Sequence, residues 1–295
     1  MRVLIAGASG MIGSELSRQL RAAGHDVLRL VRREPRSTDE YNWAPAARMI
    51  DFTLMERVDA VVNLSGASIS RIPWTAAWKR QILASRLEAT HTLTDAMRMA
   101  STPPSVFVSG SAVGFYGDRP GQKLTESAIK GGGFLSDVVE AWESAAHLAP
   151  SGTRVATVRT GLVIGRGGAM KPLLPLARLG LTGPIAGGGQ YWPWVSLRDE
   201  VAAMVHLLGS DLHGPVNVAG PTPATSDATL RALARAVHRP YGLPLPRKAV
   251  TLALGDAGRE LLLASQKVVP QKLLDDGFVF RDPTVQDAMN RLVAR

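Results

Sequence analysis

The chain has 295 residues, of which 45% are hydrophobic and 20% are charged, a composition typical of a globular protein with a sizeable core. It contains no cysteine, which excludes disulfides, thiolate catalysis and zinc sites with cysteine ligands. The net charge of +9 comes from basic residues scattered along the chain without interleaved aromatic residues. This favours a basic surface with a pocket for an anion and argues against nucleic-acid binding.

Continuous apolar strands alternate with helical stretches through the first half of the chain. Such an alternation predicts βαβ units, which build a parallel sheet with helices on both faces. We therefore expect an α/β fold, a Rossmann-type doubly wound parallel sheet. The expected strands cover Arg2–Ala6, Asp26–Val31, Asp59–Leu64, Ser105–Ser109 and Arg154–Ile164, and the expected helices cover Met11–Ala23, Thr75–Met99 and Phe134–Leu148.

Glycine and proline become frequent from Arg166 onward, and the rest of the chain predicts a smaller C-terminal substrate lobe. We divide the chain into a Rossmann-type core over 1–165, a mixed region over 166–245 that completes the sheet and a pocket beside it, and a C-terminal helical segment over 246–295. The expected elements of the second half are a strand at Pro215–Val218 and helices at Asp199–Leu208, Ser226–Val237, Thr251–Leu263 (interrupted near Gly255) and Pro283–Val293.

A G-x-x-G-x-x-G loop lies directly between the first expected strand and the first expected helix. Glycines at these places permit a tight turn and a close backbone approach to a pyrophosphate, and the N-terminus of the helix offers free N–H groups to that anion. The sequence therefore predicts a dinucleotide site. Its expected contacts in the loop are Gly7, Ala8, Ser9, Gly10, Met11, Ile12 and Gly13.

Two arginines, Arg32 and Arg33, follow the second expected strand. An NAD site usually has an acidic residue here to bind the ribose 2′-hydroxyl, but the first acidic residue is Glu34, beyond both arginines. A guanidinium suits a 2′-phosphate through charge-assisted and often bidentate hydrogen bonds. We therefore predict NADP(H) as the cofactor, with ordinary surface arginines as the alternative.

A short turn, Asn63–Ala67, closes the next expected strand. The carboxyl ends of parallel strands line the cofactor crevice in this fold. Leu64, Ser65 and Gly66 are therefore expected to border the adenosine side of the cofactor, and a purely structural turn is the alternative.

Several motifs in chain order resemble a known family. Together they are similar to the extended short-chain dehydrogenase/reductases and, more narrowly, to the "epimerase family protein" branch of the NAD-dependent epimerase/dehydratases. The resemblance covers nearly the whole chain and implies a Rossmann core, NADP(H) binding and a small substrate lobe. It also assigns Val163 to the cofactor site and Arg86 to a place where extended members have an asparagine that faces the cofactor. The motifs are Gly7–Gly13, Asn63–Gly66, Ser85–Glu88, Ser109–Gly117, Thr125–Glu126, Phe134–Leu135, Trp142–Glu143, Arg159–Gly165, Gly189–Gln190, Trp194–Val195, Ser265–Lys272 and Gly277–Phe278.

The catalytic pair of ordinary members of this superfamily is missing. Those members use a Tyr as general acid or base and a Lys four residues later, which lowers the pKa of the Tyr, on one face of a helix. None of the four tyrosines of this chain has a Lys four residues later. By position, Phe134 replaces the Tyr and Val138 replaces the Lys, and neither side chain can transfer a proton.

Three other residues are the candidates for catalysis. Ser109 and Ser111 end the fourth expected strand, near the usual catalytic serine. Tyr116 is the nearest candidate for a proton partner, with a packing or turn role as the alternative. For Glu143, beside Trp142, we expect an ion pair on the helix surface, with a carboxylate in the pocket as the alternative.

The glycine-rich and aromatic segment Gly187–Trp194 lies where extended members border their substrate. We expect Gln190, Trp192 and Trp194 at the substrate pocket, and core anchors are the alternative for the two tryptophans. The six histidines show no pair at metal-ligand spacing, so no metal is expected.

Two functions remain open at this point. The full second lobe favours an NADP(H)-dependent oxidoreductase or epimerase that acts on an unidentified small molecule, whereas the missing Tyr–Lys pair favours a catalytically silent NADP(H)-binding sensor or scaffold. The opening apolar run is too short for a signal peptide, and no stretch approaches the roughly 20 apolar residues of a membrane span. We expect a cytoplasmic monomer or homodimer with no membrane or nucleic-acid partner.

Overall fold

The central sheet organises the chain, of which a computed structural model describes residues 1–294. All neighbouring strands of this eight-stranded sheet run parallel except the last, β4, which is antiparallel to β3. The strand order reverses between β1 and β5, as in a doubly wound sheet. From one edge to the other the strands are β12 (Gly214–Val218), β8 (Arg154–Thr160), β6 (Val106–Ala112), β5 (Ala60–Asn63), β1 (Arg2–Ala6), β2 (Asp26–Val31), β3 (Glu40–Ala44) and β4 (Met49–Ile50).

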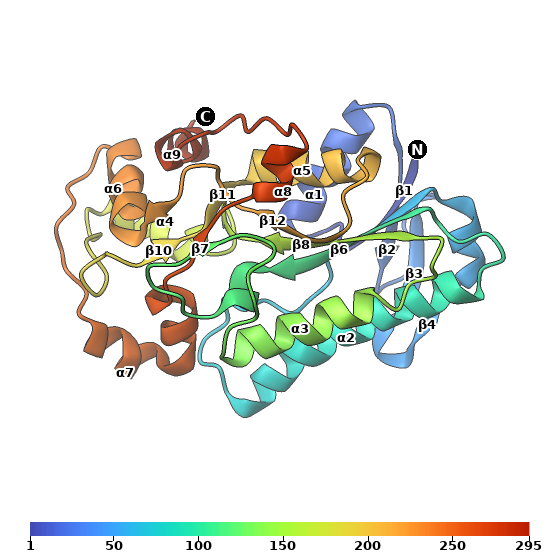
Figure 1. The fold of residues 1–295 in the computed structure, drawn as a ribbon, viewed down its shortest axis with the longest axis horizontal. Helices are drawn as coiled ribbons and strands as arrows, with labels where there is room; N and C mark the ends of the chain where they lie inside the picture. Colours follow the sequence, from blue (N-terminus) through green and yellow to red (C-terminus); the bar gives the residue numbers. More distant parts are fainter. Residues whose placement is uncertain (295) are drawn as a thin grey trace.

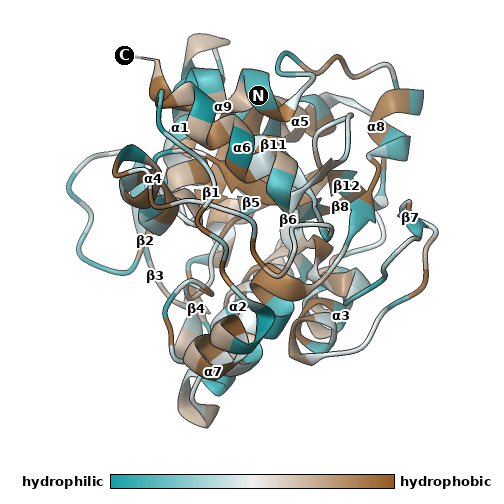
Figure 2. Ribbon diagram, turned by 90° about the vertical axis from the view of Figure 1, so that its left-hand side faces the viewer, coloured by the Kyte–Doolittle hydropathy of each residue, from teal (hydrophilic) through white to brown (hydrophobic). Residues whose placement is uncertain are grey.

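Helices cover both faces of this sheet (Figure 1). On one face lie α1 (Met11–Ala22) and α5 (Leu197–Gly209), and on the other lie α2 (Ala76–Met99) and α3 (Phe134–Ala146). Successive strand residues point to opposite faces, so Ile5 packs in the core under α1 and α5 while Leu4 packs in the core over α2. Figure 2 shows hydrophobic ribbon in the central strands near β1 and β5, while the helices around them carry both hydrophobic and hydrophilic residues.

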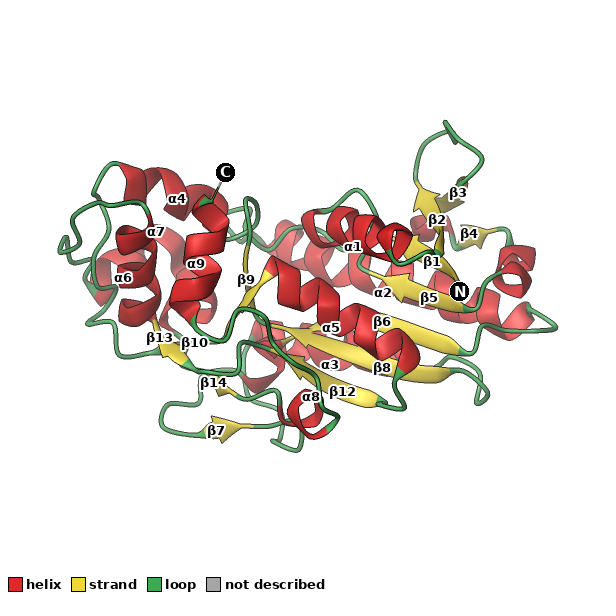
Figure 3. Cartoon of the chain, turned by 90° about the horizontal axis from the view of Figure 1, so that it is seen from above, coloured by secondary structure: helices red, strands yellow, loops and turns green. Residues whose placement is uncertain are grey.

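A smaller lobe lies beside the carboxyl ends of the strands (Figures 1 and 3). Its helices are α4 (Met170–Arg178), α6 (Ser226–Ala236), α7 (Arg247–Gly258) and α9 (Val285–Val293), with α8 (Gln271–Asp275) against β12. Short strand pairs connect the segments: β9 (Leu162–Ile164) with β11 (Trp194–Ser196), β10 (Tyr191–Trp192) with β13 (Ala224–Thr225), and β7 (Lys123–Leu124) with β14 (Lys267–Val268). In the described part of the chain no helix combines the length and apolar character needed to cross a bilayer.

The doubly wound α/β fold is confirmed, and the late strand β12 returns to the sheet beside β8 as expected. The single strand expected over 154–164 is wrong, because the chain breaks at Gly161. A Cβ there would lie 2.0 Å from the carbonyl oxygen of Pro193, so only glycine permits the close passage that turns β9 toward β11.

Several elements were not expected from the sequence, among them α4 and β3. The helix α4 contains Pro175 and lies in the glycine- and proline-rich region, yet its residues Met170 and Ala177 are buried in a core with Trp194. Tertiary packing therefore overrides the poor helix propensity of the segment. The strand β3 is a short, largely polar segment that gave no clear signal of its own. The expected interruption near Gly255 is present as a backbone break with φ of 54°.

Candidate functional site

The carboxyl ends of β1, β2 and β5 enclose a cavity of about 890 Å³, which we call the large cavity. It lies at the point where the strand order reverses, the usual ligand crevice of a doubly wound sheet. The structure here brings together three segments that the sequence predicted separately: the glycine loop, the paired arginines and the turn after β5. The predicted residues that line the cavity are Gly7, Ala8, Ser9, Gly10, Arg32, Arg33, Leu64, Ser65 and Gly66.

The glycine loop has the shape that an anion such as a pyrophosphate requires. Gly7 has φ of +86°, and a Cβ on it would lie 2.7 Å from the carbonyl carbon of Leu64. A Cβ on Gly13 would lie 2.3 Å from the carbonyl oxygen of Gly7. Because Gly10 caps α1 without a side chain, the N–H groups of the first helical turn stay open to an anion in the cavity. Met11, Ile12 and Gly13 support the loop from α1 and do not line the large cavity.

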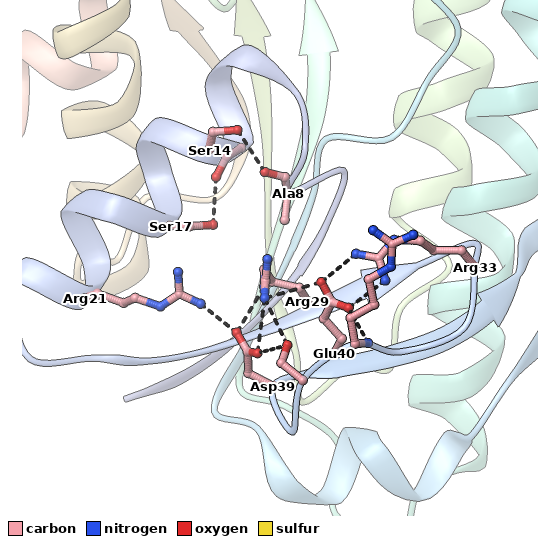
Figure 4. A network of polar contacts seen from close by, with 11 residues as sticks. Ala8, Ser14, Ser17, Arg21, Arg29, Arg33, Asp39 and Glu40 are labelled. Atoms are coloured by element: carbon pink, nitrogen blue, oxygen red, sulfur yellow. Dashed lines mark hydrogen bonds and ion pairs between the residues drawn. The ribbon is translucent and has the colours of Figure 1, made fainter.

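The two predicted arginines have different surroundings. Arg33 makes a bidentate pair with Glu40, with Nη1–Oε2 of 2.7 Å and Nη2–Oε1 of 2.8 Å (Figure 4). The guanidinium of Arg33 holds the pKa of the Glu40 carboxyl down at about 2. Arg32 is exposed, lines the cavity and has no side-chain partner within the described residues. Arg32 is thus the cation that is available to a bound phosphate, while Arg33 is held as part of the cavity wall.

A second cavity of about 150 Å³, which we call the small cavity, lies against α3 between Leu135 and Trp142. Leu135, Val138 and Trp142 form an apolar wall on α3, and Phe134 packs edge-on against Trp74 with ring centroids 5.6 Å apart. The face that carries Tyr and Lys in ordinary members of the superfamily is therefore apolar here. The polar side chains that line the small cavity are Arg86, Thr160, Glu260 and Gln266.

Arg86 lies where the two cavities approach each other, because its neighbour Ser85 lines the large cavity. Its Nη1 donates hydrogen bonds to the carbonyl oxygens of Ala67 at 3.1 Å and Ile82 at 2.9 Å, and its guanidinium stacks over Trp142. Burial lowers the pKa of Arg86 to about 10, so the side chain remains a cation at neutral pH. Arg86 thus brings a positive charge to the lining of the small cavity.

A buried polar network lies behind the small cavity. Arg159 binds Glu143 with Nε–Oε1 and Nη2–Oε2 distances of 2.8 Å, and Ser111 Oγ donates to Glu143 Oε1 at 2.6 Å. Arg159 Nη1 also donates to the hydroxyl of Tyr116 at 3.0 Å. The surface ion pair expected for Glu143 is wrong, because Glu143 is 8% exposed and Arg159 is 3% exposed.

The candidate catalytic residues Ser109, Ser111 and Tyr116 are buried and line neither cavity. The hydroxyl of Tyr116 donates to Asn217 Oδ1 at 2.6 Å, and burial raises the pKa of Tyr116. A hydroxyl held in this way cannot reach a ligand in the small cavity. The placement of Tyr116 agrees with the packing role and not with that of an acid or base toward substrate.

Of the three residues predicted for the substrate pocket, one lines the small cavity and two do not. Trp192 lines the small cavity and donates from Nε1 to the carbonyl oxygen of Leu262 at 3.1 Å. Trp194 is 1% exposed and anchors the lobe's core, and the side chain of Gln190 is bound to backbone carbonyls. Val163 pairs with Val195 between β9 and β11 and lines neither cavity.

Two acidic residues near the small cavity were not singled out from the sequence. Glu260 lines it and accepts hydrogen bonds from the backbone N–H groups of Phe134 at 3.0 Å and Leu135 at 2.8 Å, which caps α3. Glu200 is fully buried on α5, and its Oε1 lies 2.7 Å from Thr160 Oγ1. Acidic residues are common in the first turn of a surface helix, so the local sequence gave no signal that Glu200 is buried.

Comparison with known families shows to which family the chain belongs. Residues 3–220 match the model of the NAD dependent epimerase/dehydratase family, and residues 245–292 match a domain of unknown function (DUF1731). The chain therefore belongs to the NAD-dependent epimerase/dehydratase family, and the second match covers the segment from α7 to α9.

Relatives of the chain are found in bacteria and animals. The epimerase family protein Mb2239 of Mycobacterium bovis is 40% identical over 99% of this chain and 98% of its own length. A crystal structure of human epimerase family protein SDR39U1 (isoform 2) with NADPH is 33% identical, with a TM-score of 0.91 and 99% of each chain covered. A nucleoside-diphosphate sugar epimerase from Corynebacterium glutamicum is 30% identical with a TM-score of 0.80, and the match covers 99% of this chain and 58% of that one.

Proposed function

We propose that the chain is an NADPH-dependent oxidoreductase that reduces a small carbonyl compound in the small cavity. The observation that carries this proposal is the large cavity, which joins a glycine loop suited to an anion to an arginine that has no side-chain partner among residues 1–294. The backbone of Gly7–Gly10 would hold the pyrophosphate, Arg32 the 2′-phosphate, and Leu64–Gly66 the adenosine side. The NADPH in the human relative of similar fold supports this choice of cofactor.

The small cavity supports the reductase part of the proposal. When bound, a reduced nicotinamide supplies a hydride to an electrophilic carbon. The apolar wall of α3 and Trp192 would exclude water from that carbon, and the Arg86 guanidinium would orient a polar or anionic group of the substrate. The second lobe closes this cavity through Trp192, Glu260 and Gln266.

A specific observation favours a second function, an NADPH-binding sensor or scaffold without turnover. Phe134 and Val138 occupy the positions of the usual catalytic pair, and Tyr116 is buried in the network with Arg159 and Asn217. None of the three can give a proton to a ligand in the small cavity.

One titration separates these functions. NADPH fluorescence is followed as purified protein is added, with NADH in parallel, and a panel of aldehydes and ketones is then added to the complex. Tight NADPH binding with oxidation by a panel member supports the reductase. Binding without oxidation by any member favours the sensor, and a protein that binds neither nucleotide overturns both functions.

The Arg32→Gln variant tests the cofactor choice. Loss of a charge-assisted hydrogen bond to the 2′-phosphate is expected to weaken NADPH binding about tenfold to a hundredfold, because such bonds contribute about 1.5–3 kcal/mol. NADH has no 2′-phosphate, so its affinity should stay the same. Arg36→Gln is the matched control, since Arg36 is exposed near the same strand and does not line the cavity. Equal loss for both nucleotides would contradict the assignment of Arg32.

A further inference from the structure

A buried carboxyl group and a hydroxyl group meet at the carboxyl end of β8, beside the small cavity. Thr160, the last residue of β8, lines this cavity. Behind it, Glu200 of α5 has no exposed surface, and its Oε1 lies 2.7 Å from Thr160 Oγ1. The second oxygen, Oε2, is buried without any hydrogen-bond partner in the described residues. Thr160 thus connects a fully buried acid to the cavity where the substrate is proposed to bind.

The surroundings of Glu200 keep it protonated. Burial raises the pKa of its carboxyl group to about 8, and no cation within residues 1–294 offsets this effect. The strands β6, β9 and β11, which pack against α5, carry no charged residue. Most charged residues on the adjoining elements are engaged elsewhere: Glu15 with Arg18, Arg21 with Asp39, Arg154 with carbonyls of α5, Arg159 with Glu143, and Asp199 with the N–H groups of Arg281 and Asp282. Arg198 of α5 is partly exposed and forms no ion pair with Glu200 among the described residues.

The two oxygens of Glu200 indicate where the proton lies. A proton on Oε2 would have no acceptor, whereas a proton on Oε1 can be donated to Thr160 Oγ1. The hydroxyl hydrogen of Thr160 then donates a long hydrogen bond of 3.4 Å to the carbonyl oxygen of Val158, which a closer acceptor in the cavity can replace. The pair therefore holds a hydroxyl whose hydrogen can be donated into the cavity.

We propose that Thr160 and Glu200 form a proton relay that protonates the substrate oxygen in the small cavity, in place of the absent Tyr–Lys pair. This inference rests on the proposed carbonyl reduction. Thr160 is the catalytic residue of the relay, since it lines the cavity proposed for the substrate, and Glu200 is a positioning residue that acts through it.

The relay balances in protons and electrons. Reduction of a carbonyl group to an alcohol adds a hydride, which carries two electrons and one proton, to the carbon. The nicotinamide nucleotide supplies this hydride, and a second proton is added to the oxygen. The O–H bond of Thr160 breaks as the O–H bond of the alcohol forms, and Thr160 takes the proton of Glu200. The glutamate that remains regains its proton from water through Thr160 after the product leaves.

Two variants and a matched control test the relay. General acid catalysis contributes about 100-fold to 10,000-fold to a rate, so Thr160→Val and Glu200→Gln are expected to slow substrate-dependent NADPH oxidation at least about 100-fold. Affinity for NADPH should stay within about twofold. Thr157→Val removes a buried hydroxyl without a partner from the same strand, outside both cavities, and should keep the wild-type rate.

Two readouts separate this role from a structural one. The infrared band of a protonated carboxylic acid should be present in the wild type at pH 7, disappear as the pH rises through about 8, and be absent from Glu200→Gln. The wild-type reduction rate should fall over the same pH range, and the residual rate of Glu200→Gln should not.

Three results would overturn the relay. If the acid band is absent at pH 7, Glu200 is ionised and the relay is wrong whatever the protein reduces. If the wild type reduces a carbonyl and Glu200→Gln keeps its rate and pH profile, the relay is wrong while the proposed function stands. If the wild type binds NADPH but reduces no compound of the panel, the proposed reductase function is wrong and the relay with it.

Discussion

The Glu200→Gln variant is expected to be more stable than the wild type at alkaline pH, by up to about 4 kcal/mol at pH 8. In the unfolded chain this carboxyl group has a pKa near 4.5, and burial in the folded protein raises its pKa to about 8. The folded state therefore keeps a proton that the unfolded state has lost. Stability is highest below pH 4.5 and falls by about 1.4 kcal/mol for each pH unit up to the folded pKa. Glutamine has no proton to lose, so the variant escapes this decrease.

Urea unfolding at a series of pH values between 5 and 8.5 measures the effect. The difference in unfolding free energy between variant and wild type should be small at pH 5 and grow steadily toward pH 8. Glu140→Gln changes an exposed carboxylate on α3 that pairs with Lys130, so its difference from the wild type should not grow with pH. Parallel stability curves for Glu200→Gln and the wild type would show that Glu200 is not a buried neutral acid.

The burial of Glu200 lowers the stability of the protein as the pH rises, and this cost bears on the proposed function. A leucine or glutamine in its place would avoid the loss of stability above pH 4.5, and within residues 1–294 Glu200 forms no ion pair that would offset this loss. Its single hydrogen-bond partner in that part of the chain, Thr160, lines the small cavity. Groups whose burial lowers stability are commonly found at functional sites. Glu200 adjoins the small cavity, where the catalytic tyrosine of ordinary superfamily members is missing.

Those parts of the site that depend on local chain geometry were predictable from the sequence. The glycine loop needs only a strand, a tight turn and a helix start in succession, and the structure has all three at Arg2–Ala6, Gly7–Gly10 and Met11–Ala22. The return of β12 to the sheet follows from a short apolar segment after a helix. Local patterns of this kind are decided by neighbouring residues, which the sequence shows directly.

The parts that depend on contacts between distant segments were not predictable. Arg32 and Arg33 look alike in the sequence, and only the pairing of β2 with β3 brings Glu40 beside Arg33 and leaves Arg32 free. Glu143 has the pattern of a surface residue on a helix, and its partner Arg159 lies on β8. In both cases the partner is chosen by strand order and packing, which no local pattern encodes.

Breaking the buried pair of Glu143 and Arg159 should have a large destabilising effect. Glu143→Ala leaves the guanidinium of Arg159 charged and enclosed, with the Tyr116 hydroxyl and the Phe115 ring beside it and no other carboxylate paired with it in the described residues. Removal of one partner of a buried ion pair typically costs about 3–5 kcal/mol, because the remaining charge has lost both water and its counter-ion. Urea unfolding at pH 7 measures this loss.

Two further variants distinguish an unpaired charge from a simple loss of packing. Glu140→Ala removes a carboxylate from the same helix one turn earlier, where its side chain is 56% exposed, and should change the unfolding free energy by less than about 1 kcal/mol. The double variant Glu143→Leu/Arg159→Met replaces both charges by apolar side chains and should recover most of the stability. If the double variant is as unstable as Glu143→Ala, the loss comes from packing or from the hydroxyl groups of Ser111 and Tyr116. If it recovers, the network behind the small cavity is maintained by charge balance, and Tyr116 serves there as a partner of Arg159.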